Sequence, residues 1–169
     1  MIALVLALVG SNSVAQGLGQ RVRTLGQWTV YRSVNSMTDQ VTCVATANDG
    51  SVQVTVDTFS IGYRGRGGVS SYRYRLDDGP ATELHLASGI ERDIGAFIIR
   101  GDEFQNILKA NRIRVEALTI LRGLANDDID LTGLHSIYPT LSTNTCAPAE
   151  PAPSEASSRS AVGNHRTRR

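Results

Sequence analysis

The fold is decided by residues 97–146, which read FIIRGDEFQNILKANRIRVEALTILRGLANDDIDLTGLHSIYPTLSTNTC. Within this stretch, apolar residues recur at helical spacing over residues 102–110 and predict a short helix that packs on a sheet. Three of them fall on one helical face: Phe104, Ile107 and Leu108. Asp102 and Gln105 have the spacing of a capping box, and Asn111 is suited to a left-handed helix end.

Two antiparallel strands are predicted after this helix, over residues 112–118 and 125–131. One register brings two pairs of opposite charges together: Arg114 with Asp128 and Arg112 with Asp130. Such pairs favour a register by a few tenths of a kcal/mol to about 1 kcal/mol. We therefore interpret these charges as determinants of strand pairing and not as a binding site.

The last apolar residues of the stretch again have helical spacing: Leu134, Ile137, Tyr138 and Leu141. Pro139 lies inside this pattern, and proline lacks the N–H that an interior helical position donates. We expect a kink here, or a single turn followed by a new start, before the domain ends at Cys146.

The first half of the chain predicts strands and tight turns. Residues 28–34 and 41–47 alternate as strands with Trp28, Val30, Val41, Cys43 and Ala45 facing inward. The turn sequence at residues 48–50, Asn-Asp-Gly, joins the second of these strands to the alternating Val52, Val54 and Val56. Residues 41–58 should therefore form a hairpin.

A second hairpin is predicted from residues 71–76 and 83–87, separated by an Asp-Asp-Gly-Pro turn. In this hairpin the first strand should bury Tyr72, Tyr74 and Leu76, and the second should bury Leu84 and Leu86. A short apolar strand over residues 96–99 follows. These elements predict a mainly β (α+β) fold, an antiparallel β-sandwich-like domain with two short helices and one disulfide.

The ends of the chain differ in composition from residues 16–146, which we expect to form a single periplasmic domain. Residues 1–15 begin with MIALVLALVG and end in Ser-Val-Ala, as a signal peptide cleaved after Ala15 would. An uncleaved anchor or a buried strand are the alternatives. Residues 147–169 are rich in Pro, Ala and Ser and predict a disordered tail. After cleavage we expect no stable membrane insertion.

The chain's two cysteines, Cys43 and Cys146, lack the spacing of metal ligands. In an exported protein they predict a disulfide, whereas in a protein that is not exported they would be buried thiols. The formal net charge of +1 gives no support for charge-driven binding to nucleic acid or membrane. No cofactor is expected.

No motif in the sequence predicts a reaction. The three histidines, His85, His135 and His165, have no carboxylate and nucleophile at an informative spacing, and no G-x-S-x-G motif occurs. The acidic group Asp127, Asp128 and Asp130 lacks the glycine and bidentate glutamate of a calcium loop. We therefore expect a protein that is not an enzyme.

Three segments together resemble the periplasmic TagO/VasI family, which is associated with type VI secretion: YRYRLDDGPA, FIIRGDEFQNILKANRIRVEA and DIDLTGLHSIYPTLSTNTC. The matching places are residues 75–79, residues 130–134 and Cys146, and the first half matches more loosely through Trp28 and residues 36–39. The chain departs from the family pattern at Pro139, at the long RGRGG loop and in its extra C-terminal tail. The resemblance implies an accessory role in the periplasm.

Our leading hypothesis is a non-enzymatic periplasmic accessory protein that binds another envelope or secretion-system protein. Its candidate contact residues are Tyr63, Arg64, Arg66, Arg73 and Arg75. The alternative is that the arginines serve only solubility, which is the simpler interpretation of an exposed basic group. One alternative is an envelope hydrolase that acts on cell-wall material through Asp39, Asp77 or Asp78, and another is polyanion binding through RGRGG and the tail.

Overall fold

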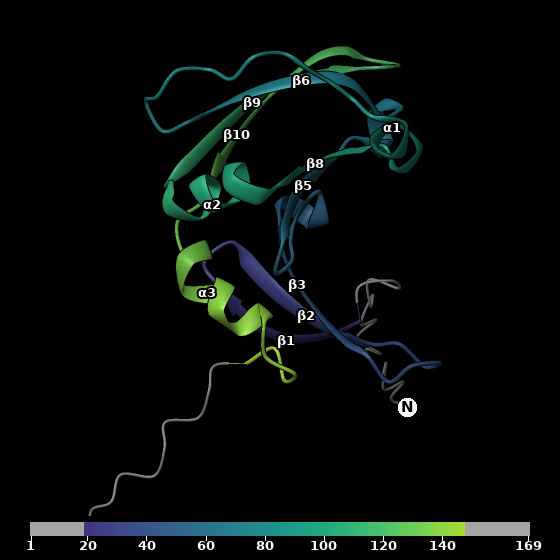
Figure 1. The fold of residues 1–169 in the computed structure, drawn as a ribbon, viewed down its shortest axis with the longest axis vertical. Helices are drawn as coiled ribbons and strands as arrows, with labels where there is room; N and C mark the ends of the chain where they lie inside the picture. Colours follow the sequence, from purple (N-terminus) through teal and green to yellow (C-terminus); the bar gives the residue numbers. More distant parts are fainter. Residues whose placement is uncertain (1–18, 148–169) are drawn as a thin grey trace, which may run out of the picture.

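The computed structural model describes residues 19–147. Two antiparallel sheets make up the fold, a six-stranded sheet in the order β1-β2-β3-β4-β5-β8 and a four-stranded sheet in the order β10-β9-β6-β7. Figure 1 shows the four-stranded sheet at the top, the six-stranded sheet curving below it, α2 and α3 along one side, and α1 at the other. The predicted mainly β (α+β), sandwich-like fold is confirmed.

The strands of the six-stranded sheet are β1 (Gln20–Leu25), β2 (Trp28–Val34), β3 (Val41–Ala47), β4 (Val52–Val54), β5 (Thr58–Gly62) and β8 (Ala96–Arg100). Those of the four-stranded sheet are β6 (Val69–Leu76), β7 (His85–Leu86), β9 (Arg112–Thr119) and β10 (Gly123–Asp130). The α-helices are α1 (Gly89–Ile94), α2 (Gly101–Lys109) and α3 (Leu134–Leu141), one more than expected, and two single turns of 3-10 helix are η1 (Asn48–Gly50) and η2 (Arg64–Arg66).

The core fills the space between the sheets and under α2 and α3. Its largest fully buried side chains include Trp28, Phe59, Phe97, Phe104 and Ile137, which come from both the strands and the helices. Each fully buried side chain of this size contributes roughly 1.5–3 kcal/mol relative to exposure. Of the predicted inward positions, Val41 is only partly buried, whereas the others are buried: Trp28, Val30, Cys43, Ala45, Val52 and Val54.

The pairing of β9 with β10 has the register that the charges predicted. Arg114 lies opposite Asp128 and Arg112 lies opposite Asp130. Arg112, however, donates its hydrogen bonds diagonally to Asp128, while the carboxylate of Asp130 accepts one from the backbone N–H of Thr132. Diagonal neighbours on a sheet face are within reach of a long side chain. The register prediction is confirmed, and the partner of Arg112 is corrected.

The second hairpin exists, but the predicted phase of its second strand is wrong. Leu84 and Leu86 are 61% and 78% exposed, whereas the ring of His85 stacks on that of Tyr72 with centroids 5.2 Å apart. Alternation places His85 inside because β7 pairs with β6 so that Tyr72 and His85 are opposite each other. In the first hairpin, β4 ends at Val54, and Val56 is consequently exposed.

Helix α2 has the predicted buried face but not the predicted ends. Its N-cap is Arg100, with no side-chain hydrogen bond, because Gly101 (φ +61°) turns the chain directly from β8 into the helix. The C-cap Ala110 is extended, and Asn111 is not left-handed. The capping box lies instead at α1, where the Ser88 side chain and Glu91 satisfy each other's backbone N–H groups.

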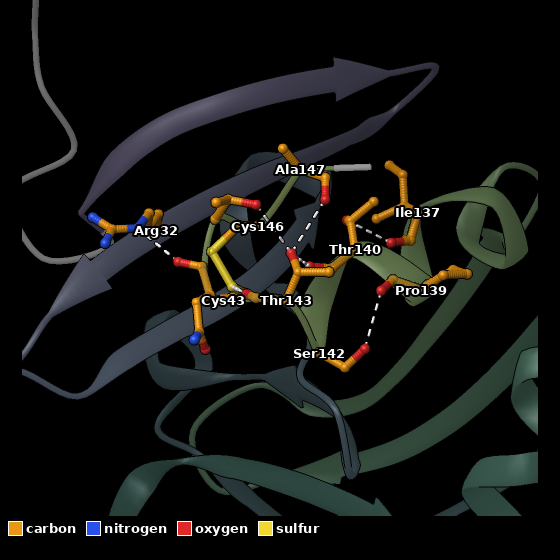
Figure 2. The surroundings of a disulfide bond; sticks show 11 residues. Arg32, Cys43, Ile137, Pro139, Thr140, Ser142, Thr143, Cys146 and Ala147 are labelled. Atoms are coloured by element: carbon orange, nitrogen blue, oxygen red, sulfur yellow. Dashed lines mark hydrogen bonds between the residues drawn. A yellow bond between two sulfur atoms is a disulfide. The ribbon is translucent and has the colours of Figure 1, made fainter. Parts of the chain in front are cut away.

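Helix α3 continues through Pro139 as one helix, so the alternative of a single turn followed by a new start is wrong. The missing N–H costs a single bond near the end of an eight-residue helix, and the buried Ile137 and Leu141 hold it against the core. The hydroxyls of Thr140 and Ser142 donate to the carbonyls of Ile137 and Pro139, as Figure 2 shows.

The predicted disulfide between Cys43 and Cys146 is present, with Cα atoms 5.5 Å apart. Figure 2 shows it linking β3 to the segment that follows α3. Within residues 19–147, no helix has the length and apolar character needed to span a bilayer. The predicted signal peptide (1–15) and the tail (147–169, apart from Ala147) lie outside the described residues.

Candidate functional site

The candidate site is the outer face of the four-stranded sheet, the face directed away from the core. Alternation places the buried residues of β9, Ile113, Val115 and Ala117, on the inner face. The outer face then carries Leu124, Asn126 and Asp128 of β10; Arg112, Arg114, Glu116 and Leu118 of β9; Ser71, Arg73 and Arg75 of β6; and Leu86 of β7. These residues divide into an apolar part and a charged part.

The apolar part, which we call the leucine row, consists of Leu124, Leu118 and Leu86. Leu124 pairs with Leu118, Leu118 pairs with Ser71, and Ser71 pairs with Leu86, so the row crosses all four strands. Leu124 and Leu118 are 58% and 47% exposed, and Leu86 is more exposed still. Ser71, between Leu118 and Leu86, is buried. Two further exposed apolar residues, Ile120 and Leu121, follow β9 directly.

The charged part, which we call the charged band, lies beside the leucine row. Arg73 pairs with its cross-strand neighbour Glu116 at 2.6 Å, and Arg112 forms a two-pronged ion pair with Asp128. Arg114 makes only longer contacts, 3.5 Å to Asp78 and 3.9 Å to Asp128. Most of the band is therefore neutralised by pairs that are exposed to solvent.

The ionisation of the band follows from these pairs. The hydrogen bonds from Arg112 hold the pKa of the Asp128 carboxyl below its usual value, and the same bonds raise the pKa of Arg112. Hydrogen bonds from the side chain and backbone of Thr132 lower the pKa of Asp130. Asp128 and Asp130 are therefore charged at neutral pH.

A hollow of about 450 Å³ lies over the charged band. Six residues of the outer face line it: Arg73, Arg75, Arg114, Glu116, Asn126 and Asp128. The rest of the lining comes from Ala81 of the β6–β7 loop and from the neighbouring strand residues Tyr74, Val115 and Asp127. The hollow thus combines cationic and anionic side chains, which fits recognition of a polar group on a partner.

Of the five predicted contact residues, the structure brings Arg73 and Arg75 to this face and separates the other three from them. Tyr63 is 4% exposed and lies in the core, where its hydroxyl donates to Asp127 at 2.6 Å. Burial raises the pKa of Tyr63, and the bond to Asp127 raises it further. The Nε of Arg64 donates to the carbonyl of Ile94, and Arg66 lines a different hollow beside Tyr63.

The RGRGG loop is part of the packed structure. The backbone N–H of Leu121 donates to the carbonyl of Arg66, and that of Ile120 to the carbonyl of Gly68. Gly67 has a φ of +82°, and a Cβ there would overlap the side chain of Leu121. The glycines therefore allow the loop to approach the β9–β10 turn, which accounts for the glycine-rich sequence without a polyanion.

The acidic residues of the hydrolase alternative do not converge. Asp39 lies in the turn between β2 and β3 of the six-stranded sheet, whereas Asp77 and Asp78 follow β6. The Asp77 carboxylate accepts a hydrogen bond from the backbone N–H of Asn111, which joins two turns. Across residues 19–147, no group of three or more His, Cys, Asp or Glu side chains is arranged to hold a metal ion.

The sequence analysis missed the leucine row, although a signal for it was present. The alternation that puts Arg112, Arg114 and Glu116 on the outer face of β9 puts Leu118 there too. The pairing that places Arg114 opposite Asp128 also places Leu118 opposite Leu124. Two of the three leucines were therefore derivable from the predicted register, whereas Leu86 was not.

Comparisons with known proteins place the chain in no family. No family model matches the chain, and no curated protein matches it. One similar solved structure is the crystal structure of invasion associated protein B from Bartonella henselae, which is 10% identical with a TM-score of 0.44. The similarity covers 70% of this chain and 92% of that one. A TM-score of this size carries no argument about the function of this protein.

Proposed function

We propose that this protein is an exported, non-enzymatic accessory protein that binds another protein of the cell envelope through the outer face of the four-stranded sheet. The observation that carries the proposal is the leucine row, whose exposed leucines lie in register on β10, β9 and β7, with the buried Ser71 of β6 between two of them. Single exposed leucines are common, but contiguous apolar patches rimmed by polar residues mark interaction sites.

The arrangement of the face fits a protein partner. Protein interfaces combine an apolar centre with a polar rim, and here the leucine row supplies the centre while Arg73 and Glu116 begin the rim. A lipid surface would favour a basic rim, whereas this face carries the carboxylates of Glu116 and Asp128 beside its arginines. We therefore assign the face to a protein with an apolar patch and its own charged rim.

Two observations support an exported location. The disulfide between Cys43 and Cys146 belongs to an oxidising compartment, and residues 1–15 have the composition of a signal peptide. We further propose that the partner is a component of type VI secretion or of envelope assembly, an assignment supported by the resemblance to the TagO/VasI family.

A crosslinked pull-down from the periplasmic fraction of the native host tests the proposal. Leu118→Glu places a charge in the centre of the leucine row and should abolish capture of a partner that the wild-type protein retains. Val34→Glu is the matched control, because Val34 is 46% exposed in β2 of the other sheet. Equal capture by the wild type and both variants, at unchanged melting temperature, would contradict the proposal.

A further inference from the structure

Two arginines lie directly opposite each other in the charged band. Arg75 of β6 pairs in register with Arg114 of β9. Like charges at directly opposite positions destabilise a sheet, and elsewhere in the band each arginine has a close carboxylate. The pair of Arg75 and Arg114 therefore places two guanidinium groups side by side without a carboxylate directly opposite either of them on the other's strand.

The carboxylates nearby are already engaged or distant. Within residues 19–147, the side chain of Arg75 makes no hydrogen bond or ion pair. Arg114 has two long contacts, one of them to Asp78, whose side chain is fully exposed, and its buried Nε has no hydrogen-bond partner. Asp128 is occupied by Arg112. Both guanidinium groups thus retain unused donors.

Both guanidinium groups line the hollow of about 450 Å³ on the outer face. We propose that Arg75 and Arg114 bind a carboxylate of the partner protein, supplied by an Asp or Glu side chain. The planar donors of a guanidinium match the two oxygens of a carboxylate, so one carboxylate can bridge the two arginines. This inference rests on the proposed function, because the partner supplies the ligand.

The hollow favours a carboxylate over a phosphate. Glu116 and Asp128 also line it, and their negative charge repels a dianion more strongly than a monoanion. Along β6, Arg75 is four residues from Ser71, which places the site about 13 Å from the leucine row. The partner should therefore present an acidic side chain at about that distance from its own apolar contact.

Nuclear magnetic resonance of the arginine Nε–H groups tests the site directly in the purified protein. Sodium acetate, titrated against sodium chloride at constant ionic strength, should shift the Arg75 and Arg114 signals saturably. The response should disappear in Arg75→Gln and persist in Arg73→Gln, since Arg73 is already paired with Glu116. A linear response equal to that of chloride, or saturation by inorganic phosphate but not by acetate, would overturn the assignment.

The same variants in the pull-down separate this inference from the proposed function. We expect Arg75→Gln to reduce partner capture at least tenfold and Arg73→Gln to reduce it less. If Leu118→Glu abolishes capture while Arg75→Gln leaves it unchanged, the face binds a partner but the carboxylate site is refuted. If acetate binds at Arg75 while Leu118→Glu captures the partner normally, the leucine row is not the contact surface and the proposed function fails, whereas the carboxylate site stands.

Discussion

The hydroxyl of Tyr63 donates a hydrogen bond of 2.6 Å to the carboxylate of Asp127. Tyr63 follows β5 of the six-stranded sheet, and Asp127 belongs to β10 of the four-stranded sheet, so this bond joins the two layers. The ring of Tyr63 also stacks against Phe97 with centroids 6.2 Å apart. Tyr63, which the sequence analysis gave as a candidate contact residue, is therefore a residue that joins the two sheets.

Removing the Tyr63 hydroxyl should destabilise the protein without disturbing its core. Tyr63→Phe keeps the ring but leaves the Asp127 carboxylate without its donor, which should cost about 1–3 kcal/mol of unfolding free energy. Urea unfolding followed by the fluorescence of the buried Trp28 measures this. Tyr31→Phe is the control, because the Tyr31 hydroxyl makes no hydrogen bond within residues 19–147. Equal stability of the two variants would contradict the role of this bond.

Gly67 should resist substitution, whereas its neighbour Gly65 should not. Gly67→Ala forces a side chain into a left-handed conformation against Leu121, which should cost about 1–2 kcal/mol. Gly65 has open space around it, so Gly65→Ala should change stability by less than about 0.5 kcal/mol. Thermal unfolding measures the stability of both variants. If Gly65→Ala lowers stability as much as Gly67→Ala, the interpretation of the RGRGG loop as part of the packed structure is refuted.

Loss of the disulfide should lower the stability of the whole domain. Replacing both Cys43 and Cys146 by Ala opens a loop with a sequence separation of 103 and should cost about 2–5 kcal/mol. Guanidinium unfolding under oxidising conditions should show the loss, and the wild type treated with a reductant should shift towards the variant. A variant as stable as the oxidised wild type would show that packing of α3 alone is sufficient.

Glu91 should make stability depend on acid pH. Burial raises the pKa of this carboxyl, but the hydrogen bonds from Ser88 and Ile98 outweigh burial, and the net pKa in the folded protein is lowered. A lowered folded pKa stabilises the protein above the unfolded pKa of about 4.3, and this contribution is lost as pH falls through the folded value. Urea unfolding between pH 7 and 3 measures how the unfolding free energy changes with pH. This change should be smaller for Glu91→Gln than for the wild type, and intermediate for Ser88→Ala. An unchanged pH dependence in Glu91→Gln would contradict this account.

The sequence was most informative where the same residues showed two independent patterns, such as strand alternation and opposite charges across the strands. In β9 and β10 the alternation fixed the faces, and the charges of Arg114 and Asp128 fixed the register, so both were predicted correctly. Cys43 was placed inward by the alternation of β3, which is also what allows its bond to Cys146. Agreement between independent signals made these predictions accurate.

The predictions were wrong where the outer face of a strand is apolar and where a helix is too short to show a period. In β7 the leucines were assigned to the core, but the inner position belongs to His85, because the outer face there continues the leucine row. Helix α1 was missed, since six residues beginning with Gly89 are too few to show a helical period, although Ser88 and Glu91 carried the capping signal. The part of the candidate site that lies on β6 and β7 was not predicted, because β6 pairs with β9, which is distant from it in sequence.

The disulfide divides the described chain into a covalently closed part and an open part. The ring from Cys43 to Cys146 contains the entire four-stranded sheet, whereas β1 and β2 lie before it. A single proteolytic cut inside the ring therefore leaves two fragments linked through sulfur, and the candidate binding face stays attached to α3. A cut between β2 and β3 instead leaves the β1–β2 hairpin without a covalent link to the rest of the domain. In a compartment that contains proteases, the face proposed to meet the partner is thus protected against loss by a first cleavage.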